Sequence, residues 1–142
     1  MHIPDGFLDP VVAGVTYVVS IAYAVYAFRR LRAEKARLEL VTPLAAGIFA
    51  AQMLNWPLPG GTSLHFVGGA LSGILLGPWL GFLPMFLVLL VQCFLFHDGG
   101  ITALGANLLN MAIIDALVGY AACRLAPKRH KFFGAFFGGW LG

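Results

Sequence analysis

Long apolar runs, separated by short polar or glycine- and proline-rich segments, organise this chain. The runs cover residues 11–28, 40–56, 66–96, 101–125 and 132–142. About 20 apolar residues in a helix cross a hydrocarbon core of about 30 Å. The third run is too long for one span, and Gly77-Pro78 is the natural break within it. The pattern predicts an all-α, polytopic transmembrane helix bundle with about five complete spans and the start of a sixth.

Composition and charge add a topology to this pattern. Hydrophobic residues make up 60% of the chain and charged residues 11%, against about 25% charged in soluble domains. All nine Lys and Arg lie in two segments, 29–37 and 124–131. Five spans put both segments on one side, which the positive-inside rule assigns to the cytoplasm. We therefore expect a multi-pass protein of the cell membrane with its N-terminus outside.

The outer face then gathers three of the four histidines. His2 lies near the N-terminus, His65 ends the 57–65 loop, and His97 begins the 97–100 loop. Residues 1–10 contain no Lys or Arg, so they do not resemble the basic start of a signal peptide. We therefore expect the N-terminus to be retained. We expect Met1 to be retained as well, with its amine available for chemistry, because the aminopeptidase that removes the initiator methionine accepts only small second residues and His2 is large.

These groups can form a chelate. The Met1 amine, the amide nitrogen of His2 and His2 Nδ1 would close a five- and a six-membered ring around one metal ion. A further imidazole, from His65 or its competitor His97, would complete a planar set of four nitrogens, which suits Ni(II) and Cu(II). The alternative is that His2 is simply a polar chain end. His65 would then be only a helix-start residue next to capping Thr62 or Ser63.

Other polar residues are candidates for a supporting role. Asp5 could orient a ligand through a hydrogen bond or cap the first helix. Gln92 and Asn107, near outer helix ends, could hold the N-terminal segment over the metal, and His97 could also support a ligand. Asp115, inside the last full span, could belong to a structural hydrogen-bond network or take part in ion coupling. Gly69, Gly73 and Gly77 recur every four residues, which predicts close helix packing.

Three segments carry a resemblance to a known family. They are MHIPDGFL at residues 1–8, PGGTSLH at 59–65 and GGITALGAN at 99–107. They resemble the cobalt/nickel substrate-binding subunits of energy-coupling factor transporters, the CbiM/NikM family. The resemblance implies that Met1, His2 and His65 bind the transported Ni(II) or Co(II). It also implies a single membrane domain over 1–142. Family members usually continue through one or two more helices.

The same resemblance implies that the chain is not an enzyme. It implies a membrane coupling subunit and ABC-type ATPases as partners, with a small accessory membrane subunit as a further one and no nucleic acid. The chain has no GxxxxGK[ST] segment, so energy would come from those partners. One rival is a membrane subunit that binds a vitamin or other small molecule and carries incidental histidines. The other is an intramembrane metalloenzyme, against which stands the lack of an HExxH pair.

Overall fold

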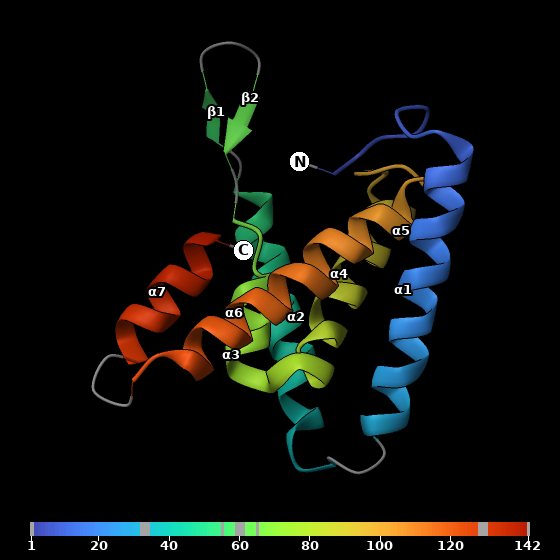
Figure 1. Ribbon diagram of the computed structural model, residues 1–142. Coiled ribbons are helices and arrows are strands. Elements are labelled where there is room, and N and C mark those ends of the chain that lie inside the picture. The colour runs from blue at the N-terminus through green and yellow to red at the C-terminus, as the bar shows by residue number, and fades with distance from the viewer. Residues whose placement is uncertain are drawn as a thin grey trace.

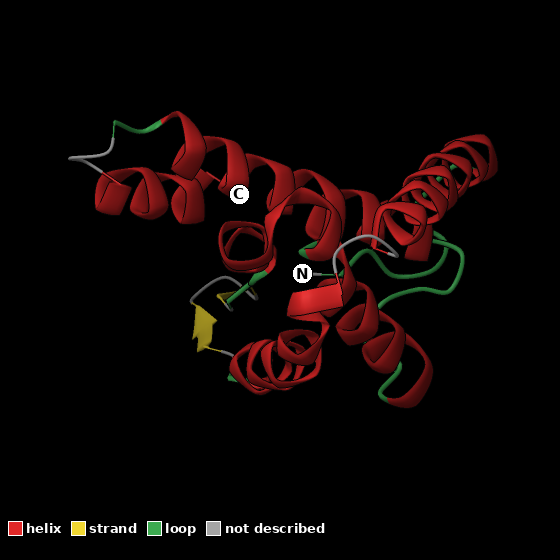
Figure 2. Ribbon diagram, turned by 90° about the horizontal axis from the view of Figure 1, so that it is seen from below, coloured by secondary structure: helices red, strands yellow, loops and turns green. Residues whose placement is uncertain are grey.

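The computed structural model describes residues 2–31, 35–54, 56–58, 62–64, 66–127 and 131–141. Met1 and His65, two of the three expected metal ligands, lie outside these ranges. The described chain is predominantly helical, with one small hairpin (Figures 1 and 2). In order the elements are α1 (Pro10–Leu31), the 3-10 helix η1 (Lys35–Leu40), α2 (Val41–Met53), β1 (Trp56–Leu58), β2 (Thr62–Leu64), α3 (Gly69–Leu80), α4 (Phe82–Leu95), α5 (Leu104–Asn107), the π-helix η2 (Leu108–Ile114), α6 (Asp115–Leu125) and α7 (Lys131–Leu141).

Within the described residues, two continuous helical segments are long and apolar enough to cross a membrane. They are α1 and the α5–η2–α6 segment, Leu104–Leu125, each of 22 residues. Along α1, exposed apolar side chains recur at intervals of three or four residues, which places them on one face: Val11, Val15, Val18, Ile21 and Val25. Such a face suits contact with lipid.

The third apolar run forms a bent pair of helices. The backbone breaks at Gly77, which has a φ of +83° that favours glycine, and α3 and α4 are inclined at 114° to each other. The break lies where Gly77-Pro78 predicted it. Leu80, Phe82 and Met85 follow the bend and are fully buried, so the turn itself is part of the hydrophobic core.

The predicted glycine packing is found at two of the three positions. Gly69 and Gly73 of α3 face the backbone of the η2–α6 segment so closely that neither position has room for a Cβ. Gly77 instead forms the break and has open space around it. The prediction was therefore wrong for Gly77, because its backbone conformation ends the regular face on which Gly69 and Gly73 lie.

Two other details differ from expectation. The 57–65 segment was predicted as a loop, but Trp56 pairs with Leu64 and Leu58 with Thr62 in an antiparallel hairpin. The count of five spans is not confirmed. Helix α2 has 13 residues, about 20 Å of helix, which is shorter than a hydrocarbon core. With the bent pair counted as one span, up to three spans have suitable length and composition in the described residues.

The chain gathers several connecting segments at one end. The N-terminal segment, the β1–β2 hairpin and the start of α5 lie at the top of Figure 1. From there α1 leads down toward Arg29 and Arg30, and α6 leads toward Arg124. The end with the N-terminus is therefore distinct from the end with these arginines.

Candidate functional site

The N-terminal segment, residues 2–8, docks against a loop almost one hundred positions later. We call residues 97–103 the docking loop. The backbone N–H of Gly100 donates to the carbonyl of Ile3 at 2.9 Å. A Cβ at Gly100 would collide with the backbone of Pro4 and Asp5. The glycine thus permits a backbone-to-backbone approach that other residues would prevent.

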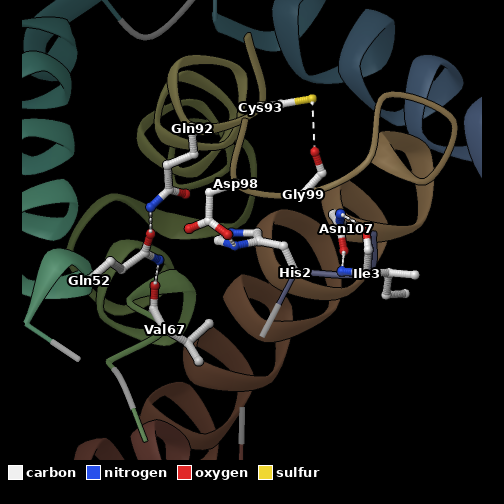
Figure 3. Close-up of polar contacts among 9 residues, drawn as sticks. All are labelled: His2, Ile3, Gln52, Val67, Gln92, Cys93, Asp98, Gly99 and Asn107. Carbon is white, nitrogen blue, oxygen red and sulfur yellow. Dashed lines mark hydrogen bonds and ion pairs between the residues drawn. The ribbon is translucent and has the colours of Figure 1, made fainter. Parts of the chain in front are cut away.

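Asn107 holds the same residue from the other side. The Ile3 N–H donates to Asn107 Oδ1 at 2.9 Å, and Asn107 Nδ2 donates to the Ile3 carbonyl at 3.2 Å (Figure 3). Asn107 is 3% exposed and ends α5. Both backbone groups of the residue after His2 are therefore fixed by one buried side chain.

Asp5 makes a second attachment. Its Oδ1 accepts hydrogen bonds from Thr102 Oγ1 at 2.5 Å and from the Thr102 backbone N–H at 2.7 Å. The side-chain bond first, and the backbone bond next, lower the pKa of Asp5 below its usual 3.8. The carboxylate therefore ties the N-terminal segment to the docking loop. It does not cap α1, whereas Asp9 accepts from the Val11 N–H at 2.8 Å.

His2 is enclosed by these attachments. Its side chain is 3% exposed, and its Nδ1 lies 3.1 Å from Oδ1 of Asp98 in the docking loop. Figure 3 shows the imidazole beside the Asp98 side chain, and a Cβ added at Gly99 would lie 2.9 Å from the His2 Cβ. Because a carboxylate can only accept, Nδ1 carries the hydrogen in this contact. The ring nitrogen expected to bind metal is thus in contact with an acidic side chain.

A chain of buried amides lies behind Asp98. Gln92 Nε2 donates to Gln52 Oε1 at 2.7 Å, and Gln52 Nε2 donates to the carbonyl of Val67 (Figure 3). The backbone N–H of Asp98 donates to the Gln92 carbonyl at 2.9 Å. The ends of α2 and α4, the docking loop and the segment just after His65 are therefore connected through polar contacts.

Helix α1 contacts both the docking loop and the start of α5. The Tyr17 hydroxyl donates to the carbonyl of Ile101, and the buried Ser20 hydroxyl donates to the carbonyl of Gly105 at 2.8 Å. Cys93 of α4 contacts the Gly99 carbonyl at 3.7 Å. The loop that receives the N-terminal segment is therefore attached to two helices.

The structure brings four of the predicted site residues to one end of the molecule: His2, Asp5, Gln92 and Asn107. His97 lies there too, exposed and with a φ of +54°. Met1 and His65 lie outside the described residues. Asp115 is 3% exposed, and its carboxyl group packs against Gly69 at the start of α3. Asp115 lies where the η2–α6 segment packs on α3.

Sequence reasoning missed Asp98, Thr102 and Gln52. Asp98 follows His97 in a loop of the outer face, so its position was a usable signal for a contact with His2. Thr102 and Gln52 had no comparable signal, because nothing in the sequence pairs them with residues 97 and 40 positions away.

The arrangement can position nitrogen donors but does not complete a metal site. Among residues 2–31, 35–54, 56–58, 62–64, 66–127 and 131–141, no group of three His, Cys, Asp or Glu side chains could hold a metal ion. His2 and Asp98 are two such groups in contact.

Comparison with known proteins shows which family this chain resembles. Residues 2–142 match the model of the family CbiM, the cobalt uptake substrate-specific transmembrane region. A protein of Archaeoglobus fulgidus with the provisional name of fused nickel transport protein NikMN is 57% identical over 142 residues. The alignment covers 100% of this chain and 48% of that protein. Cobalt transport protein CbiM of Clostridium tetani is 33% identical over 147 residues, covering 100% of this chain and 61% of that protein.

A solved structure has the same fold. The crystal structure of a truncated transition metal transporter aligns with a TM-score of 0.89 at 36% sequence identity. The alignment covers 99% of this chain and 68% of that chain. This chain thus spans about half to two thirds of the relatives and structure that it matches.

Proposed function

Because this chain belongs to the CbiM family of substrate-specific transmembrane components of cobalt and nickel transport, we propose that it captures the metal ion at the outer face of the cell membrane. The observation that carries the proposal is the docked N-terminal segment. Its His2 side chain is 3% exposed, and the next residue is fixed on both sides by Asn107. An N-terminal segment fixed by these contacts is suited to binding a ligand rather than to serving as a loose chain end.

The proposed ligands are the Met1 amine, the amide nitrogen and Nδ1 of His2, and an imidazole nitrogen of His65. The first three belong to the first two residues of the chain, and the two hydrogen bonds between Asn107 and Ile3 restrict the orientation of the peptide next to His2. Val67, two residues after His65, is connected through Gln52 and Gln92 to the end of α4. The described residues that follow His65 are thus connected to the docking loop that holds the N-terminal segment.

The cargo is Ni(II) or Co(II). Four nitrogens in a plane, one of them a deprotonated amide, favour a metal high in the affinity order, and planar coordination suits Ni(II). Relatives of this chain are named for nickel and for cobalt transport. Nickel is therefore the ion to test first, with cobalt beside it.

The proposed topology has the N-terminus outside and five complete passes. The N-terminal segment, the hairpin and the docking loop share one end of the molecule, away from Arg29, Arg30 and Arg124 (Figure 1). Positive residues favour the cytoplasmic side, which supports capture from the outer side.

Transport needs further subunits in this proposal. The chain contains no GxxxxGK[ST] segment that would hold ATP phosphates. A membrane coupling subunit and ABC-type ATPases would supply the energy, and a small accessory membrane subunit is a further partner. The role of this chain is then to select the ion and present it to that machinery.

The proposal is tested by adding a flexible four-residue Gly-Ser-Gly-Ser extension before Met1. Purified protein with a native Met1 should bind nickel tightly, whereas the extended protein should lose most of its affinity, because the Met1 amine becomes an amide and the new terminal amine lies too far from His2 to close the chelate. His2→Ala and His65→Ala should also lose binding, while His130→Ala, in the basic segment, should not. Equal nickel affinity in native and extended proteins would contradict the proposed ligand set. Absence of nickel and cobalt binding in the native protein would contradict the function.

A further inference from the structure

The buried amides of Gln52 and Gln92 form a hydrogen-bond relay with a fixed direction. Gln92 is 0% exposed and Gln52 is 5% exposed. They come from different helices, α4 and α2, and meet at 2.7 Å. A side-chain amide has a donor end and an acceptor end, so a row of amides can point either way unless something sets its direction.

The backbone carbonyl of Val67 sets the direction of this relay. A carbonyl oxygen can only accept, so the NH₂ group of Gln52 must face Val67. Gln52 Oε1 then faces Gln92 and can only accept, so the NH₂ group of Gln92 must face Gln52. The remaining end of Gln92 is its carbonyl oxygen, Oε1, which Figure 3 shows on the side of Asp98 and His2. The relay therefore presents an acceptor to the candidate site.

That acceptor has no donor in the described part of the chain. Gln92 Oε1 is buried and makes no hydrogen bond to any described residue. The carboxylate of Asp98, on the same side, is a further acceptor. A buried acceptor without a partner is costly, so its persistence indicates that a donor is supplied there. Imidazole and amine ligands of a metal carry such an N–H, and metal ligands commonly donate it to an oxygen acceptor.

We propose that Gln52 is a positioning residue for the metal site. Through its contact with Val67, Gln52 restrains the segment that follows His65. Through its contact with Gln92, it turns Gln92 Oε1 toward the site, where that oxygen accepts an N–H from a metal ligand. This inference rests on the proposed function, because the donor is a ligand of the transported ion.

The competing explanation is that the two glutamines only join helices α2 and α4. Both explanations predict some loss of thermal stability when either side chain is removed. Only the positioning role predicts a change in the metal complex itself. The test therefore measures the nickel dissociation constant, by competition with a chelator of known affinity, and the visible absorption spectrum of bound Ni(II), which differs between planar and octahedral coordination.

The variants are Gln52→Leu, Gln92→Leu and the double variant, all in the full chain with a native Met1. Each single variant should weaken nickel binding about 10- to 100-fold, as loss of a partner of a ligand does, and should shift the Ni(II) spectrum. The double variant should bind no more weakly than the weaker single one, because both changes break the same relay. If Gln52→Leu does not fold, Gln52→Met takes its place, since it keeps the length of the side chain without its polar atoms.

Ser72→Ala is the matched control. Ser72 is 0% exposed and its hydroxyl donates to the Gly81 carbonyl at 2.5 Å, near the bend between α3 and α4. This variant also removes a buried hydrogen bond, but it should leave nickel affinity and spectrum unchanged.

Wild-type affinity and spectrum in Gln52→Leu would overturn the inference. The inference would also be overturned if the fold-losses of nickel affinity in the two single variants multiplied in the double variant, because Gln52 and Gln92 would then contribute independently. Failure of the proposed function gives a different result. In that case the native protein binds no nickel, or the N-terminally extended protein binds as well as the native one.

Discussion

Asn107 and Ile3 form a reciprocal pair across 104 positions of sequence. Ile3 donates its N–H to the side-chain oxygen at 2.9 Å, and its carbonyl accepts from the side-chain nitrogen at 3.2 Å. An amide side chain is the one type that matches both backbone groups of a residue at once, because it carries a donor and an acceptor side by side. The pair fixes the peptide unit next to the proposed His2 ligand.

Loss of this pair should weaken metal binding. We expect Asn107→Leu to reduce nickel affinity about 10- to 100-fold, as changes that release a metal ligand do. Asn107→Asp, which keeps an acceptor for the Ile3 N–H but has no donor, should have a smaller effect. Asn110→Leu is the control, because Asn110 lies three residues later and is exposed. Equal nickel affinity in Asn107→Leu and Asn110→Leu, measured by chelator competition, would contradict the role of Asn107.

Metal binding should break the contact between His2 and Asp98. The same nitrogen, Nδ1, lies 3.1 Å from Asp98 Oδ1 and is the proposed ligand atom, and it cannot carry a hydrogen and bind a metal together. Diamagnetic, planar nickel should therefore shift the His2 Nδ1 resonance in ¹⁵N NMR away from its N–H value. An unchanged Nδ1–H signal in nickel-loaded protein would show that the metal does not use this atom.

The contact between Asp5 and Thr102 should be lost only in strong acid. A carboxyl group whose pKa falls on folding stabilises the folded state above its unfolded pKa. That contribution is lost as pH drops through the folded pKa. The pKa of Asp5 is lowered from 3.8, so the contact with Thr102 should be intact at neutral pH and disappear below 3.8.

The variant Thr102→Val tests what lowers the pKa of Asp5. The Thr102 hydroxyl is the largest contribution to the lowered pKa of Asp5, so removing it should move that pKa upward toward the usual value. A ¹³C NMR titration of the Asp5 carboxyl carbon in both proteins measures the change. An identical midpoint in the two titrations would show that the hydroxyl does not hold Asp5.

The packing of α3 on α6 should be sensitive to one methyl group. A Cβ at Gly73 would overlap the backbone of Ala116, so we expect Gly73→Ala to lower the free energy of unfolding by about 1–3 kcal/mol. Gly47 of α2 is the matched control, because no atom lies within 4 Å of the position of its Cβ. There alanine should raise the free energy of unfolding by about 0.5–1 kcal/mol. Thermal unfolding in the same detergent compares the two.

Features that depend on local pattern were predictable from the sequence. The apolar runs gave the extents of α1 and of the 104–125 helical segment to within a few residues, because hydrophobic length is a local property. The break at Gly77 was also local, since Gly-Pro interrupts a helix wherever it stands. The hairpin was missed because its three-residue strands are too short to show an alternating pattern.

The candidate site was less predictable. Sequence gathered His2, Asp5, Gln92 and Asn107 at the outer face through topology, and the structure places these four at one end. It could not reveal that Asp98 contacts His2 or that Gln52 connects Gln92 with Val67. Those contacts depend on how distant elements pack, and a single Asp or Gln in an apolar chain does not show its partner. The ligand roles of Met1, His2 and His65 stay predictions.

The long-range docking of the N-terminal segment sets an order of assembly. Its partners lie 96 to 104 positions along the chain, and a chain made from its N-terminus exposes early segments before late ones exist. During synthesis the first eight residues must therefore wait until α5 and the docking loop have entered the membrane. In the proposed function, the ability to hold an ion is then acquired only after these elements are made, so defects in them would leave a protein that is inserted but not competent for capture.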